Sequence, residues 1–153
     1  MKVLDFLRLN CVIPTLRGTT KGEVLTEMAR HLAGVQPGID AVALGQALQE
    51  RELLASTAIG DGIAIPHGKL DTVENLMGVL GRSVAGLDFD SIDGKPTHLI
   101  FMLVAPTASI GAHLKALARL SRLFRDAGFR QRLIDAPDGA AMFRTIEEED
   151  AKY

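Results

Sequence analysis

Hydrophobic positions change from helical spacing to nearly continuous runs and back again along the chain. Apolar residues three or four positions apart predict helices from residue 20 to about 33, from 40 to 54 and from 109 to about 124. Shorter helices are expected over 129–134 and from residue 139 onward. Unbroken apolar runs predict strands at 76–84 and at 97–104, and the second reads as a strand covered on both faces.

Polar residues mark where the three long helices should begin. Thr20 and Glu23 have capping-box spacing, and Asp40 and Ser109 are suitable N-caps. The pattern assigns an inner face to each helix. These faces comprise Val24, Leu25, Met28 and Leu32; then Val42, Ala43, Ala47, Leu48 and Leu54; then Leu114, Leu117, Leu120, Leu123 and Phe124.

The predicted strands lie in the middle of the chain, with pairs of helices before and after them. This order predicts an α/β or α+β sandwich with a small, mostly buried sheet flanked by helices. A length of 153 residues suits one domain with a real core, spanning 1–153. We expect the acidic end, 147–153, to be frayed.

Composition narrows the function classes. A net charge of −2 gives no general attraction to nucleic acid or anionic lipid, and 5% aromatic residues without Trp disfavour a base-stacking platform. The single cysteine, Cys11, excludes an internal disulfide and reads as a small buried hydrophobe. No apolar run is long enough to insert into a membrane, so we expect a cytoplasmic protein.

The stretch 59–69 (IGDGIAIPHGK) differs from the rest of the chain in its glycines and its single proline. Its alternation predicts a short strand that ends at Pro66, which removes a backbone donor. His67 should then stand at the strand tip, with Gly68 leaving room beside the imidazole. A histidine held in this way reads as a positioned chemical group.

The other histidines divide into two kinds. For His31 and His98 a structural role is favoured. His113 falls in the first turns of the long helix, where the helix dipole disfavours the imidazolium and attracts anions. His67 and His113 lie too far apart in sequence for a zinc pattern, so no metal site is predicted.

Other motifs carry little weight. Gly60-Asp61-Gly62 alone is weak support for a phosphate loop. The basic residues of the long helix read as a solvated face balanced by the acidic tail, not as a nucleic-acid surface. These basic residues are Lys115, Arg119, Arg122 and Arg125.

Residues 60–70 (GDGIAIPHGKL) closely resemble the signature of the mannitol/fructose-type EIIA domains of the bacterial phosphoenolpyruvate-dependent phosphotransferase system. The similarity continues through Arg51-Glu52, 88–93, 103–106 and His113-Leu114. The Gly-Lys-Leu after the histidine is most similar to the nitrogen-regulatory branch of that family. His98 departs from the family pattern, and we attach no function to it.

The resemblance implies an α/β sandwich with a small mixed sheet and a phosphocarrier activity. His67 would accept a phosphoryl group on its tele nitrogen from an HPr-like phosphohistidine carrier, and no cofactor or metal is implied. His113 and Arg51 would stabilise the phosphoryl group. For Arg51 the competing interpretation is a helix-end ion pair with Glu52 or Asp61. A docked carrier needs an apolar rim, for which the candidates are Ile63, Ile65, Leu70 and Ile110.

Four interpretations of function follow. In the leading one, the phosphorylation state of His67 controls binding to regulatory targets such as transporters or kinases, so that the protein is a carrier and not a stand-alone turnover enzyme. In the second, a sugar-specific EIIA passes phosphate to an EIIB domain. The third is a binding module that is not phosphorylated. The fourth, a small hydrolase with His67 as base, lacks a recognisable nucleophile.

Overall fold

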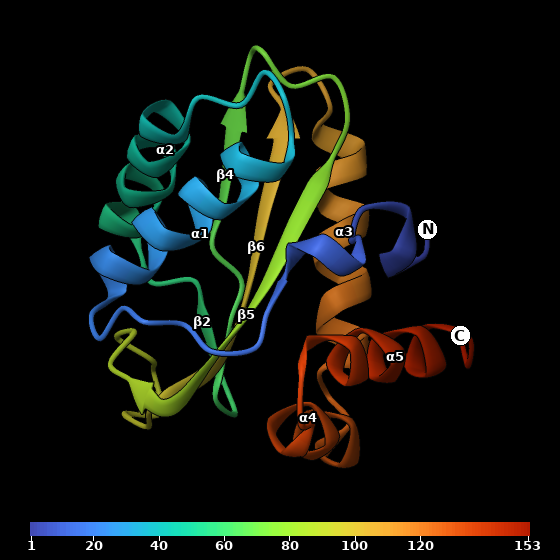
Figure 1. The fold of residues 1–153 in the computed structure, drawn as a ribbon. Helices are drawn as coiled ribbons and strands as arrows, with labels where there is room; N and C mark the ends of the chain where they lie inside the picture. Colours follow the sequence, from blue (N-terminus) through green and yellow to red (C-terminus); the bar gives the residue numbers. More distant parts are fainter.

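The computed structural model describes residues 1–153 as a sheet enclosed by helices (Figure 1). Two 3₁₀ turns, η1 (Val3–Asp5) and η2 (Leu9–Cys11), open the chain. The strands are β1 (Val12–Ile13), β2 (Ala58–Gly60), β3 (Ile63–Ala64), β4 (His67–Leu70), β5 (Met77–Leu87) and β6 (Thr97–Pro106). The helices are α1 (Lys21–Val35), α2 (Ala41–Leu54), α3 (Ile110–Leu123), α4 (Ala127–Asp135) and α5 (Gly139–Asp150).

The sheet is mixed and is built around the antiparallel pair β5 and β6. β1 runs parallel to β5 on one side. On the other side β3 and β4 both run parallel to β6, one after the other along its length, and β2 pairs antiparallel with β3. The interior of β6 from Leu99 to Ala105 is fully buried, as its apolar run predicts. The predicted α/β sandwich with a mixed sheet is confirmed.

Helices α1 and α2 lie on one side of the sheet, and α3 lies on the other with α4 and α5 beyond its end (Figure 1). The N-caps Thr20 and Asp40 are confirmed, because their side chains accept hydrogen bonds from backbone N–H groups of the first turn. Ser109 is the N-cap residue of α3, as expected, but its side chain accepts no hydrogen bond from the first turn.

Two of the predicted inner faces are partly wrong. In α2, Val42 and Leu54 are 69% and 82% exposed. The buried row of α2 follows Leu44 and Leu48, which face α1 and β4. In α3, Leu114 is 59% exposed, because the buried row runs through the neighbouring His113 and Ala116 instead. In both helices the pattern offered two adjacent apolar faces, and tertiary packing chose between them.

The acidic end of the chain is ordered into α5, so the expectation of a frayed tail is wrong through Asp150. Glu149 and Asp150 are buried and paired with basic side chains, and only 151–153 lie beyond the helix. No helix in the structure has the length and apolar character needed to cross a membrane.

Candidate functional site

The site lies at the gap between β3 and β4, the two strands that pair one after the other with the same edge of β6. β3 pairs with Leu99 and Ile100 of β6, and β4 resumes the pairing at Leu103. Between them Pro66 has no N–H to donate, but its carbonyl still accepts from Leu103 N at 2.9 Å. The predicted strand does end next to Pro66, since β3 stops at Ala64; the expectation that His67 stands at the tip of that strand is wrong, because His67 is the first residue of a new strand, β4.

The glycines around the site serve the backbone. Asp61 and Gly62 have positive φ angles of 56° and 78° and form the two-residue turn between β2 and β3. A Cβ on Gly68 would lie 3.3 Å from the Cβ of Ala47, so Gly68 permits the close approach of α2 to β4. The room at Gly68 therefore accommodates α2; the expectation that Gly68 also leaves room beside the imidazole stays a prediction.

Hydrogen bonds at both ring nitrogens fix the His67 side chain. Nδ1 lies 2.9 Å from the carbonyl oxygen of Ile65, and Arg51 Nε donates to His67 Nε2 at 3.2 Å. A carbonyl oxygen only accepts and a guanidinium N–H only donates. These partners therefore select the neutral tautomer with the proton on Nδ1 and the lone pair on Nε2.

Arg51 comes from the last turn of α2 and reaches the edge of β4. Besides His67 it donates to the carbonyl oxygen of Ala55 through Nη1 at 2.9 Å. The ion pairs with Glu52 or Asp61 that were considered from the sequence do not form. The guanidinium is thus held beside the imidazole and keeps its charge uncompensated by a carboxylate.

His113 completes the group from the other side of the sheet edge. Its ring centroid lies 4.8 Å from that of His67, with the ring planes inclined at 60°. His113 Nδ1 is buried without a hydrogen-bond partner. A buried, unpartnered ring nitrogen beside His67 is a group with hydrogen-bonding capacity to spare.

Burial lowers the pKa of both imidazoles. For His67 desolvation is the largest cause; the hydrogen bond to Ile65 opposes it, and the Arg51 charge acts with it. For His113 desolvation again leads, followed by repulsion from His67 and then from Lys69 and Arg51. The site therefore favours neutral, nucleophilic imidazole at neutral pH.

A buried carboxylate that the sequence did not single out as functional, Glu52, lies behind the site. The Glu52 side chain is 5% exposed and accepts hydrogen bonds from Thr57 and Lys21. Its one sequence signal is spacing: Glu52 continues the buried row of Leu44 and Leu48 at intervals of four residues. A carboxylate in a buried row needs partners, but the sequence does not show that one of them, Lys21, comes from another helix.

The remaining predicted residues fall outside the group. His31 and His98 each make a ring hydrogen bond to a backbone carbonyl, of Asn10 and Ser83 respectively. Cys11 is buried, as expected. Of the proposed apolar rim, Ile63 and Ile65 are core residues, so that expectation is wrong for them.

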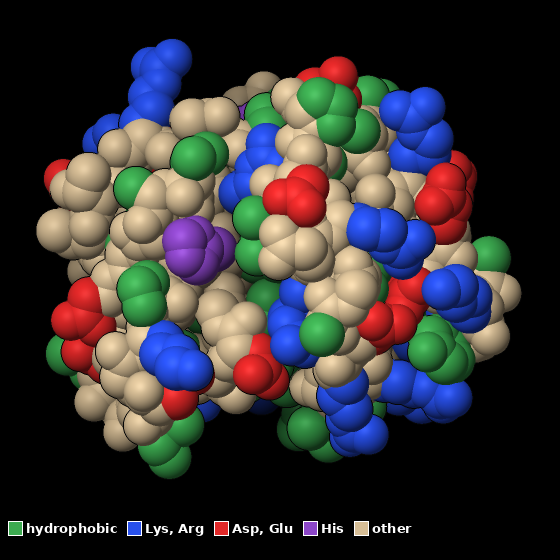
Figure 2. All heavy atoms as spheres, turned by 90° about the horizontal axis from the view of Figure 1, so that it is seen from below, with side chains coloured by type: hydrophobic (Ala, Val, Ile, Leu, Met, Phe, Trp, Pro, Cys, Tyr) green, Lys and Arg blue, Asp and Glu red, His purple; other side chains and the backbone are tan.

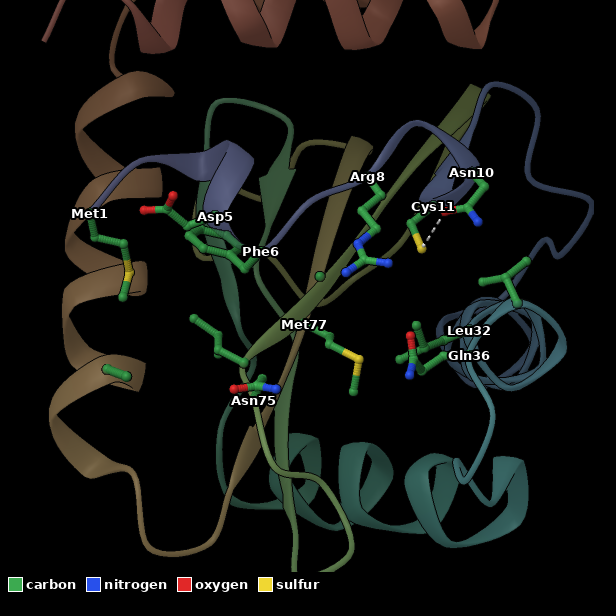
Figure 3. A pocket seen from close by; sticks show the side chains of 14 residues that line it. Met1, Asp5, Phe6, Arg8, Asn10, Cys11, Leu32, Gln36, Asn75 and Met77 are labelled. Atoms are coloured by element: carbon green, nitrogen blue, oxygen red, sulfur yellow. Dashed lines mark hydrogen bonds between the residues drawn. The ribbon is translucent and has the colours of Figure 1, made fainter.

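Surface charge and cavities do not mark another site of this kind. On the face seen from below, basic and acidic side chains alternate over the side that carries α4 and α5 (Figure 2). In α3, Arg119 pairs with Asp150 of the acidic tail, as the balanced-face interpretation implies. A cavity of about 410 Å³ separates the N-terminal segment from α1 and the start of β5, and Arg8, Leu32 and Met77 line it (Figure 3). None of the three candidate site residues lines this cavity.

Comparison with known proteins identifies the class to which this fold and site belong. The sequence profile described as "Phosphoenolpyruvate-dependent sugar phosphotransferase system, EIIA 2" matches residues 5–149. The chain therefore belongs to the EIIA 2 family of that system.

Similar proteins include members of the nitrogen-regulatory branch. The chain is 37% identical over 146 residues to the nitrogen regulatory protein of Bradyrhizobium diazoefficiens, covering 95% of each chain. The crystal structure of nitrogen regulatory protein IIA-Ntr from Neisseria meningitidis superposes with a TM-score of 0.87, at 28% identity, covering 94% of this chain and 98% of the other. The fructose-specific EIIABC component of Bacillus subtilis is 36% identical over 150 residues, which are 98% of this chain and 24% of that protein.

Proposed function

We propose that this protein is a phosphocarrier and regulator of the nitrogen phosphotransferase type, and that His67 is its phosphoryl acceptor. The observation that carries the proposal is the pair of hydrogen bonds that places the proton on Nδ1 and the lone pair on Nε2. The phosphorylation state of His67 would then control which regulatory targets the protein binds.

The transfer balances without a co-reactant. Nε2 of His67 attacks the phosphorus of a phosphohistidine on an HPr-like carrier, in line with the bond that breaks. The donor nitrogen leaves with its electron pair, while the His67 proton stays on Nδ1 against the Ile65 carbonyl. Before attack, Arg51 Nε must release the lone pair of Nε2, and the incoming phosphoryl oxygens offer the guanidinium a stronger, charge-assisted partner.

Arg51 and His113 would share the charge of the phosphoryl group. A guanidinium presents several donors in a fork that matches phosphate oxygens. His113 would donate one further hydrogen bond from its ring, which lies beside that of His67 and is inclined to it at 60°. Two donors on opposite sides of the acceptor spread the charge of the transition state.

Exposed apolar side chains offer a docking rim for the carrier. Leu53 and Leu54 end α2, two and three residues after Arg51, and Ile110 and Leu114 flank His113 along α3; all four are more than half exposed. Apolar contact around the reacting histidines would exclude water from the transfer. The compartment that we propose is the cytoplasm, where the free Cys11 thiol stays reduced.

The test is a reconstituted transfer. The protein is incubated with phosphoenolpyruvate, enzyme I and an HPr-like carrier, and intact mass is measured under alkaline conditions that preserve phosphohistidine. We expect one phosphoryl group on the wild type and on the control His31→Gln, and none on His67→Ala. Equal labelling of His67→Ala would refute the proposal.

The second candidate function is that of a sugar-specific EIIA, favoured by the similarity to a fructose-specific EIIABC component. The same phosphorylated protein would then pass its phosphoryl group to an EIIB domain. Adding an isolated fructose-type EIIB to the labelled protein separates the two functions. Rapid loss of label to EIIB supports the sugar role, and a label that persists supports the regulatory role.

A further inference from the structure

The buried carboxylate of Glu52 is connected to His67 by three successive hydrogen-bonded contacts, through Thr57 and Ile65. It accepts hydrogen bonds from Thr57 N at 3.2 Å and from the Thr57 hydroxyl, and so fixes Thr57 against the end of α2. The Thr57 carbonyl accepts from Ile65 N at 3.0 Å. The Ile65 carbonyl in turn accepts the His67 Nδ1 proton at 2.9 Å. In Thr57 and in Ile65 the N–H and the C=O belong to two planar peptide units joined at Cα, so the constraint passes from one group to the next through the backbone φ and ψ of these two residues.

Lys21 neutralises this carboxylate from a different helix. Its Nζ lies 2.9 Å from Glu52 Oε2 and 2.9 Å from Asp90 Oδ2. With its oxygens occupied by Lys21 and Thr57, Glu52 does not capture Arg51, its neighbour in sequence. The guanidinium of Arg51 remains directed at His67, as the 3.2 Å contact shows.

We infer that Glu52 is a positioning residue for the phosphoryl site: through Thr57 and Ile65 it holds His67 in the Nδ1-protonated tautomer, and by binding Lys21 it leaves Arg51 free for the phosphoryl group. The inference rests on the proposed function for its effect on transfer. Its effect on the imidazole is a property of the unphosphorylated protein and does not depend on that function.

A carboxylate is suited to this task because it accepts at both oxygens. The backbone N–H and hydroxyl of Thr57 and the ammonium of Lys21 are all donors. Glutamine in place of Glu52 keeps one accepting oxygen and places an NH₂ group against the Thr57 N–H and the Lys21 ammonium, which can only donate. Alanine removes every contact and leaves the Thr57 N–H buried without a partner.

The experiment compares Glu52→Ala, Glu52→Gln and Thr57→Val with Asp150→Asn. Asp150 is a matched control, since it is also a buried carboxylate that accepts from a backbone N–H and a cation, but its partners are Leu4 and Arg119. Long-range proton–nitrogen NMR of His67 reports which ring nitrogen is protonated. Single-turnover transfer from the phosphorylated carrier reports the rate, and urea unfolding reports stability.

We expect the Glu52 variants to show a mixture of His67 tautomers and a transfer rate lower by roughly 10- to 100-fold, the size of effect that small misplacements of a reacting group produce. Thr57→Val should shift the tautomers in the same direction, and Asp150→Asn should shift neither readout despite losing stability.

A Glu52→Ala protein whose His67 tautomer is unchanged would overturn the inference, as would rates that follow stability equally for Glu52 and Asp150 variants. Should Glu52→Ala not fold, Glu52→Gln and Thr57→Val decide by the same readouts. If the wild type accepts no phosphoryl group, the proposed function fails, and the NMR comparison still tests the positioning.

Discussion

The guanidinium of Arg51 occupies the lone pair that the proposed chemistry needs. At 3.2 Å its hydrogen bond to His67 Nε2 is a long one. The bond to the Ala55 carbonyl, at 2.9 Å, anchors the other branch of the fork. Arg51 therefore has a fixed end and an end that can exchange one acceptor for another, which suits a residue that must follow a phosphoryl group as it arrives.

Replacing Arg51 tests this role. We expect Arg51→Gln to lower the single-turnover transfer rate by about 100-fold, the usual effect of losing one donor to a developing charge. Arg51→Lys should lie between Gln and the wild type, because it keeps the charge and loses the fork. The thermal midpoint should change little, since Arg51 is only half-buried. A rate unchanged in Arg51→Gln would contradict the role.

The two site histidines also predict how stability depends on pH. Burial lowers the pKa of each in the folded state. Between the lowered pKa and the unfolded value of about 6.5, the unfolded chain binds more protons, so the free energy of unfolding falls as pH falls through this window. His113→Gln removes one of these groups. In the His113→Gln variant the free energy of unfolding should therefore change less steeply with pH over this window, by at most about 1.4 kcal/mol per pH unit.

Urea unfolding at a series of pH values from about 7.5 down to about 5 measures this slope. His31→Gln is the control, because its ring lies on the surface of α1 and accounts for neither shift. Slopes that agree between wild type and His113→Gln would show that the burial of His113 does not affect its protonation.

At the residue scale, the sequence indicated which residues form the site, but not which contacts those residues and their neighbours make. His67, His113 and Arg51 were all singled out, and the structure places them together; their roles stay predictions. The turn residues Asp61 and Gly62 and the close contact at Gly68 were given other purposes, because a glycine's sequence context does not show what approaches it. Glu52 was missed because its partner Lys21 is 31 residues away.

At the scale of elements, one side chain of β5 connects the sheet to the end of a helix. Arg82 is 7% exposed and donates to four main-chain carbonyls. Three of these belong to the C-terminal end of α4, where the helix dipole is negative and the last carbonyls lack intrahelical partners. The acceptors are the carbonyl oxygens of Pro14, Leu133, Ile134 and Ala136.

Arg82→Met keeps most of the volume and removes every donor. We expect it to lower the free energy of unfolding by about 3 kcal/mol or more, because a buried carbonyl left without a partner costs about 1–3 kcal/mol. Arg125→Met is the control: that residue is exposed, and the change should stay within about 0.5 kcal/mol. Denaturant unfolding of the two variants measures the difference. If Arg82→Met were as stable as Arg125→Met, water would be replacing the guanidinium at the end of α4.

Elements with one plausible buried face were predicted well, and those with two were not. The run 97–104 has no face of polar residues that could point to solvent, so only a strand buried on both faces fits it, and β6 forms there. In α2 and α3, apolar residues cover more of the helix than the core can bury, so Val42, Leu54 and Leu114 are left exposed. The burial of Glu149 was unpredictable for the converse reason, since an acidic run reads as solvated unless its cations, Arg132 and Lys152, are known to reach it.

At the scale of the whole molecule, Asp150 joins three distant parts of the chain. Its carboxylate accepts from Leu4 N at 3.2 Å and from Arg119 of α3 at 2.6 Å. Its backbone carbonyl accepts from Lys2 Nζ at 2.7 Å. Both chain ends therefore lie on the side of the sheet that carries α3 (Figure 1). The acidic end of the chain closes the fold where the sequence suggested a loose tail.

The junction should contribute strongly to stability, because removing Asp150 leaves the Arg119 charge nearly buried and unpaired. The two side chains are 11% and 3% exposed. Asp150→Ala should lower the free energy of unfolding by about 3–5 kcal/mol, as for other buried pairs that lose one partner. Glu148→Ala is the control, since its contact with Arg132 is 4.0 Å long between side chains that are 62% and 45% exposed, and it should cost under about 1 kcal/mol. Urea unfolding measures both, and hydrogen exchange of residues 3–7 should rise in Asp150→Ala alone. Equal losses in the two variants, or unchanged exchange near Leu4, would mean that the ends of the chain are held by apolar packing and not by this carboxylate.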